Sequence, residues 1–109
     1  MNRIQNLFKK SSEKLIPFFT AGYPELESTV DLVLSAVDAG ADMIEIGIPY
    51  SDPQADGPGI QFSSQKALEN GVTIKTIFEQ VKKIRKKTDI PISLMSYYNP
   101  ILKWGHDKF

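Results

Sequence analysis

Apolar runs that scarcely alternate are separated along this chain by amphipathic stretches, and that order restricts the fold more than any other feature. Residues 15–20 (LIPFFT), 43–48 (MIEIGI) and 91–97 (PISLMSY) have the composition of buried strands. Between them, apolar residues recur every three or four positions over 25–39 and over 74–84, which predicts helices. Buried strands joined by helices are typical of a parallel sheet that helices cover. The sequence therefore predicts an α/β fold.

Glycine, proline and a hydroxyl residue mark the expected helix ends. Pro24 suits the first turn of the first long helix, and Gly40 suits the position just after its end. A short helix over 60–71 is expected to end at Gly71, and Thr73 can cap the helix that follows. Two more short helices are predicted, one near the start of the chain and one at its end. The chain thus reads as strand, helix, strand, helix, strand, with two open sheet edges.

One charged residue interrupts the second apolar run. Alternate residues of a strand face opposite sides, so Ile44, Ile46 and Ile48 share one face while Glu45 and Gly47 share the other. A carboxylate buried on that second face loses several kcal/mol of solvation free energy unless it is paired or protonated. Glu45 is therefore a candidate functional acid. A strand with one solvated face, or a buried cation beside Glu45, would explain the residue equally well.

The loop after this run, residues 49–58, carries two further carboxylates. Loops that follow the carboxyl ends of parallel strands line the ligand site in α/β folds. Asp52 and Asp56 lie in such a loop, whose three prolines restrict the backbone, and Gly57 and Gly59 permit close approach. Asp52 can instead cap a turn through its own backbone, as Ser-Asp-Pro sequences commonly do. Asp56 is the better candidate for chemistry.

Two binding motifs can be tested on the same loop, and both fail. A calcium loop counted from Asp52 would have Gln54 at its third position and Ser63 at its twelfth, where a bidentate glutamate is required. A dinucleotide-binding turn would need a third glycine where Phe62 stands. We therefore expect no metal site.

Charge and composition exclude several classes of protein. The 109 residues carry thirteen basic and thirteen acidic side chains, so no global field draws the chain to nucleic acid or to an anionic membrane. The basic run 82–87 falls at the end of a predicted helix, where a solvated face explains it. His106, the only histidine, is expected at the surface. The absence of cysteine fits a reducing, cytoplasmic environment, and no apolar run has the roughly twenty residues that a membrane span needs.

Four segments together are specific enough to indicate a family. PFFTAGYP (17–24), AGADMIEIGIPYSDPQADGP (39–58), IQ (60–61) and PISLMSYYNP (91–100) resemble the amino-terminal part of the tryptophan synthase alpha chain. The resemblance covers essentially the whole chain, and the IEIGIPYSDPxADGP segment is highly specific. It implies a (β/α)8 TIM barrel of about 250 residues, of which this chain would hold the first three β/α units. Residues 1–109 are then the amino-terminal part of one truncated barrel domain.

The resemblance also implies an activity. The family is a lyase of tryptophan biosynthesis that cleaves indole-3-glycerol phosphate to indole and glyceraldehyde 3-phosphate by a retro-aldol reaction. Glu45 matches its catalytic acid-base residue, and Asp56 matches the carboxylate that accepts a hydrogen bond from the indole N–H. Phe18, Met95 and Tyr97 match residues that line the indole pocket, although core packing would explain Phe18 and Met95 equally well.

The partner implied by the resemblance is the tryptophan synthase beta chain, in an α2β2 tetramer. Asp52 and Pro53 match the loop that touches the beta chain, which carries pyridoxal phosphate, whereas the alpha chain uses no cofactor. Gln54 and Gly59, in or next to this loop, depart from the residues usual in the family. The phosphate-binding loops of the late barrel strands are missing, so the chain alone is expected to be inactive. Two alternatives remain: a non-catalytic module that binds the beta chain, and another phosphate-using barrel enzyme assembled from pieces.

Overall fold

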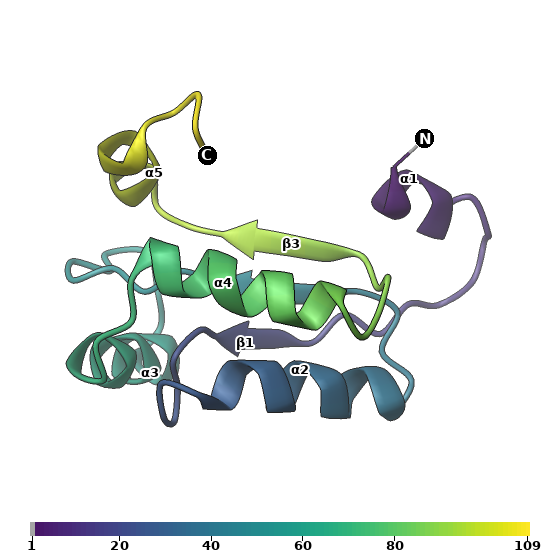
Figure 1. The fold of residues 1–109 in the computed structure, drawn as a ribbon, viewed down its shortest axis with the longest axis horizontal. Helices are drawn as coiled ribbons and strands as arrows, with labels where there is room; N and C mark the ends of the chain where they lie inside the picture. The colour runs from purple at the N-terminus through teal and green to yellow at the C-terminus, as the bar shows by residue number, and fades with distance from the viewer. Residues whose placement is uncertain (1) are drawn as a thin grey trace.

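Three parallel strands form the sheet of this fold (Figure 1). The structure, a computed structural model, describes residues 2–109. The strands are β1 (Phe18–Thr20), β2 (Ile44–Gly47) and β3 (Ile92–Met95), and β2 lies between the other two. Both pairs are parallel, with Glu45 beside Phe18 on one side and Ser93 on the other. The predicted α/β class and the two open edges, β1 and β3, are confirmed for the described residues.

Helices connect the strands and cover one face of the sheet. In Figure 1, α2 and α4 run alongside the strands, and they pack against each other, while α3 contacts β1. The five helices of the described chain are α1 (Arg3–Leu7), α2 (Ser28–Asp38), α3 (Pro58–Glu69), α4 (Ile74–Arg85) and α5 (Tyr98–Trp104).

The hydrophobic core lies between the sheet and the pair α2 and α4. Ile44 and Ile46 are fully buried and Ile48 is nearly so, which confirms the face predicted for them. Val33 of α2 and Ile77 and Ile84 of α4 complete this buried layer. The other face of β2, which carries Glu45 and Gly47, points away from the core cluster.

The first long helix starts later than its apolar pattern suggests. It was expected over 25–39 but begins at Ser28, because the Glu25 amide donates to Ser28 Oγ (3.2 Å) and the Ser28 amide donates to the Glu25 carbonyl (3.1 Å). These bonds hold residues 25–27 in a turn, so Pro24 lies before the helix and not in its first turn. The predicted end is confirmed, since Gly40 follows the cap residue Ala39 with a φ of 104°.

The helix predicted over 60–71 begins two residues earlier, at Pro58. Proline is favoured at a first helical position, where its missing N–H costs nothing, and Gly57 supplies the extended cap residue. The helix ends at Glu69, and Gly71 follows with a φ of 90°. A Cβ at Gly57 or Gly59 would meet no heavy atom within 4 Å. The expectation that these two glycines permit close approach therefore matches no contact among residues 2–109.

The strands are shorter than the apolar runs that predicted them. The carbonyls of Leu15 and Pro17 still accept hydrogen bonds from Asp42 and Glu45, but only Phe18–Thr20 forms the ladder of β1. Thr73 caps α4 as predicted, because its side chain accepts from the Thr76 amide.

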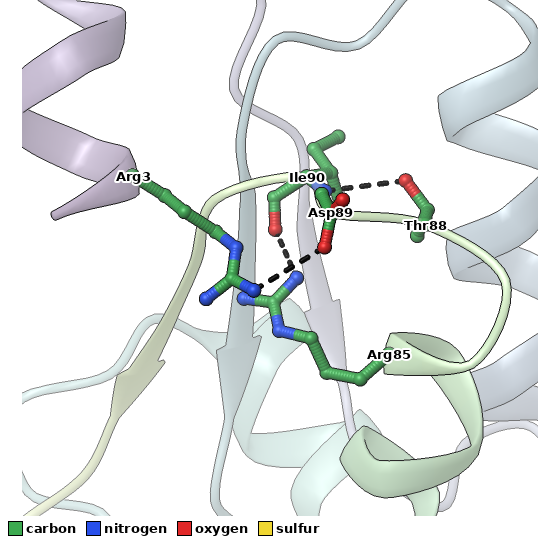
Figure 2. Close-up of polar contacts among 5 residues, drawn as sticks. All are labelled: Arg3, Arg85, Thr88, Asp89 and Ile90. Carbon is green, nitrogen blue, oxygen red and sulfur yellow. Dashed lines mark hydrogen bonds and ion pairs between the residues drawn. The ribbon is translucent and has the colours of Figure 1, made fainter.

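A polar cluster closes the end of the sheet at which β3 begins (Figure 2). Arg3 of α1 lies 3.2 Å from Asp89, and Arg85 donates to the Ile90 carbonyl. Thr88 Oγ1 accepts from the Ile90 amide at 3.2 Å. Burial, and to a smaller extent the charge of Arg3, lowers the pKa of the Arg85 guanidinium from its usual value, and Asp89 opposes this effect. The cluster ties α1 to the loop between α4 and β3.

The basic side chains of the run 82–87 therefore differ in how exposed they are. Lys82, Lys83, Lys86 and Lys87 are exposed, as the sequence predicts for a solvated helix face. Arg85 is only partly exposed and bonds to backbone, so the prediction was wrong for this residue. His106 is exposed as expected, with a 68% exposed side chain.

Candidate active site

A cavity of about 290 Å³ opens at the carboxyl ends of the three strands. Each strand or the loop that follows it contributes to the wall, and the first turns of α3 close one side. Four of the seven residues proposed from the sequence line it: Phe18, Asp56, Met95 and Tyr97. The wall is mostly apolar with a few polar groups, which is the usual character of a small-molecule site.

The floor of the cavity depends on a close contact between two strands. A Cβ at Gly47 would lie 2.4 Å from Phe18 Cζ, so the ring of Phe18 occupies the space above this glycine. Both residues line the cavity. A glycine inside a strand often marks a place where another group comes close to the backbone. The sequence contains this signal at Gly47, but the residue was not proposed for the site.

Glu45 lies beside the cavity and not in its wall. It precedes Gly47 by two residues on β2, so the Glu45 side chain lies on the side of the sheet that Gly47 leaves open, and the two Cα atoms are roughly 6–7 Å apart. Its strand neighbour across the ladder is Phe18. Glu45 is half-buried, and none of the ion pairs found among residues 2–109 involves its carboxylate or that of Asp56. The buried cation considered for Glu45 is thus absent from the described chain.

The loop that carries Asp56 is held from two sides. The Ala55 amide donates to the Tyr97 hydroxyl at 2.8 Å, and Gln61 Nε2 donates to the Asp56 carbonyl at 2.7 Å. Gln61 Nε2 also lies 3.3 Å from the Pro53 carbonyl. The sequence motif contained Gln61, but no role was derived for it.

Buried hydroxyl groups join β1 to α3 behind the cavity. Thr20 Oγ1 and Ser63 Oγ are 2.8 Å apart, and Ser63 donates to the Ile60 carbonyl at 3.0 Å. Thr20, Ile60 and Ser64 line the cavity. None of these residues was proposed from the sequence, because their approach joins segments about forty residues apart.

The two residues expected to contact a partner lie outside this cavity. Asp52 is exposed and Pro53 is half-buried. The Gln54 amide donates to the Asp52 carbonyl at 3.0 Å, so backbone closes a turn here, and the Asp52 carboxylate accepts from Gln54 Nε2 at 3.4 Å. A second, wider cavity of about 730 Å³ lies near this loop, between Tyr50, the start of α4 and α5, where Trp104 forms part of the wall.

Residues 2–109 contain no group of three or more histidine, aspartate and glutamate side chains placed to hold a metal ion. None of the helices in this range is long and apolar enough to span a membrane.

Comparisons with known proteins give the family. The family model of the tryptophan synthase alpha chain matches residues 4–109. The tryptophan synthase alpha chain of Caldanaerobacter subterraneus is 53% identical over 113 aligned residues, which cover all of this chain and 43% of the relative. The chain thus spans less than half the length of the curated relatives that it matches.

Solved structures agree on the fold. Tryptophan synthase subunit alpha from Legionella pneumophila superposes with a TM-score of 0.96 at 40% identity, covering 99% of this chain and 43% of that one. A tryptophan synthase complex from Pyrococcus furiosus gives a TM-score of 0.78 at 49% identity, covering 84% of this chain and 38% of the other. These alpha chains are TIM barrels, so the three strands and their helices are part of a (β/α)8 fold. The chain belongs to the tryptophan synthase alpha chain family.

Proposed function

We propose that residues 1–109 form the amino-terminal part of one (β/α)8 barrel domain that cleaves indole-3-glycerol phosphate to indole and glyceraldehyde 3-phosphate. The observation that carries this proposal is the position of Asp56 on the wall of an apolar cavity whose floor is Phe18 over Gly47, with Glu45 beside it on the same face of the sheet. Such a cavity suits a flat aromatic ring with one polar N–H.

Two carboxyl groups divide the chemistry. Glu45, protonated, gives its proton to the indole ring carbon that bears the glycerol phosphate chain, which places positive charge on the ring. Asp56, ionised, accepts a hydrogen bond from the indole N–H and stabilises this charge. Removal of the proton from the neighbouring glycerol hydroxyl, with help from Glu45, then lets the carbon–carbon bond break. The bond's electrons return to the ring as indole, and the hydroxyl carbon leaves as an aldehyde.

The indole ring would contact three side chains of the cavity wall. Phe18, Met95 and Tyr97 supply apolar and aromatic surface on opposite sides of the opening. Met95 is 57% exposed in this chain, so it has unsatisfied apolar surface to offer to a ring.

Residues 1–109 alone should not cleave indole-3-glycerol phosphate. Phosphate sites of TIM barrels are built by loops after the late strands, near the seventh and eighth, whereas this chain supplies three strands. The chain also leaves the cavity side of the sheet open where further strands would close it.

The partner proposed for the complete protein is the tryptophan synthase beta chain, in an α2β2 tetramer. Asp52 and Pro53 present an accessible loop, and the wide cavity beside Tyr50 and Trp104 gives a partner a surface to fill. Pyridoxal phosphate would belong to the beta chain, and no cofactor is proposed for this chain. The alternative function, a module that only binds the beta chain, uses the same loop without turnover.

A hybrid barrel tests the proposal. Residues 1–109 replace the matching segment of the Caldanaerobacter relative, and indole released from indole-3-glycerol phosphate is measured for the hybrid and for the 109-residue chain. We expect release by the hybrid and none by the chain alone. A folded hybrid without turnover would contradict the catalytic proposal. Titration of that hybrid with the beta chain would then decide whether binding alone remains.

A further inference from the structure

The backbone on both sides of the Asp56 side chain is fixed by side chains from other elements. On the amino-terminal side, the Ala55 amide donates to Tyr97 Oη at 2.8 Å. On the carboxyl-terminal side, the Asp56 carbonyl accepts from Gln61 Nε2 at 2.7 Å. The backbone of Asp56, a residue of the cavity wall, is thus held both before and after its Cα atom.

Gln61 can reach this loop because of where α3 begins. The helix starts at Pro58, so Gln61 is its fourth residue, and side chains of a helix lean toward its amino terminus. A carboxamide has two N–H donors on one nitrogen. Both have an acceptor here, the carbonyls of Asp56 and of Pro53, the second at 3.3 Å. The cap residue Gly57 has no side chain that could do the same work.

Tyr97 reaches the loop from the opposite side of the cavity. It follows β3 and is the residue just before α5. Its ring lies 5.2 Å from the ring of Tyr50, which restricts its orientation, and its hydroxyl oxygen accepts from Ala55. The side chain therefore does more than supply aromatic surface to a ligand.

We propose that Gln61 and Tyr97 are positioning residues that together hold Asp56 at the place where its carboxylate meets the indole N–H. The inference rests on the proposed function for its kinetic consequence. A carboxylate that stabilises developing charge must be placed before the reaction, and a displacement of about 1 Å can cost about 100-fold in rate. Since Gln54 and Ala55, which precede Asp56, and Gly57, which follows it, are exposed, these two contacts set that placement.

Kinetics of the hybrid barrel provide the first test. Gln61→Met keeps the side-chain length without donors, and Tyr97→Phe keeps the ring without the hydroxyl. We expect each to lower kcat by about 10- to 100-fold while KM changes less than threefold, because the lost interaction acts mainly in the transition state. Gln61→Glu, which keeps the shape but replaces the donors by acceptors, should be at least as impaired.

Two neighbouring residues serve as matched controls: Gln65, one helical turn after Gln61, and Tyr98, the residue after Tyr97. Gln65 lies on the same helix and its amide contacts only Glu69, at 3.5 Å, so Gln65→Met should leave kcat unchanged. Tyr98 is 56% exposed and its ring lies near His106, so Tyr98→Phe should also leave kcat unchanged. If Gln61→Met and Tyr97→Phe behave as these controls do, the positioning role is wrong.

A second measurement does not depend on activity. Backbone amide NMR of the hybrid should show that Tyr97→Phe shifts the Ala55 resonance and speeds its hydrogen exchange, and that Gln61→Met shifts Asp56 and Gly57. Unchanged resonances would overturn the inference even if turnover fell. Conversely, if the unmodified hybrid does not cleave its substrate, the proposed function fails, and these shifts alone decide whether the two side chains hold Asp56.

Discussion

Phe18 occupies the space that a side chain at residue 47 would need, since a Cβ there would stand 2.4 Å from Phe18 Cζ. Gly47→Ala should therefore displace the ring and disturb the cavity floor. We expect a loss of about 1–3 kcal/mol in the free energy of unfolding, as for other overpacked sites, measured by urea denaturation. Gly59→Ala is the control, because its Cβ meets no atom within 4 Å and it lies in a helix, where alanine is favoured. A neutral Gly47→Ala would contradict the described contact.

A second prediction concerns the buried face of β2. Ile46 is fully buried among the residues of α2 and α4, so Ile46→Ala should cost about 2–5 kcal/mol and Ile46→Val about 0.5–1.5 kcal/mol. Leu102, 60% exposed, should tolerate alanine with little change in the urea midpoint. Equal effects at the two positions would show that the core lies elsewhere.

The cap of α4 can be tested separately from the core. Thr73 Oγ1 accepts from the Thr76 amide at 3.1 Å, so Thr73→Ala should destabilise the chain by about 1 kcal/mol. Thr73→Ser keeps the oxygen and should retain most of the stability. Circular dichroism during urea unfolding gives the comparison, and an alanine variant as stable as serine would refute the cap.

The ion pair of Figure 2 is expected to contribute little. Arg3 and Asp89 lie 3.2 Å apart, but their side chains are 52% and 91% exposed, so water and salt screen them. Asp89→Asn should change the free energy of unfolding by less than about 1 kcal/mol at low salt, and by less still in 1 M NaCl. A larger loss that persists at high salt would mean that the pair holds α1 by more than its charge.

The order of the elements could be predicted because local patterns carry it. The period of the apolar residues located the sheet and the long helices, and alternation in β2 placed Glu45 opposite the buried isoleucines. The predicted helix starts were less accurate where a side chain competes with the helix for backbone hydrogen bonds. Ser28 does so, because its hydroxyl accepts from the Glu25 amide.

The details of the site depend on contacts between distant segments, and these have no local signal. The pairing of Tyr97 with Ala55 joins residues 42 positions apart, and the Thr20–Ser63 contact joins residues 43 apart. Gln61 lay in a motif that marked the family, but only the fold shows which carbonyls its amide reaches. Gly47 is the exception, because a glycine inside a strand already indicates a close approach.

In the proposed function, Glu45 supplies the proton on which cleavage depends. Glu45→Gln keeps the size of the side chain and removes the acid, so the hybrid barrel carrying it should fold with an unchanged circular dichroism spectrum and bind indole. We predict that its release of indole from indole-3-glycerol phosphate falls by at least about 100-fold, the lower range for loss of a positioned acid. Turnover within about threefold of the unmodified hybrid would contradict the account.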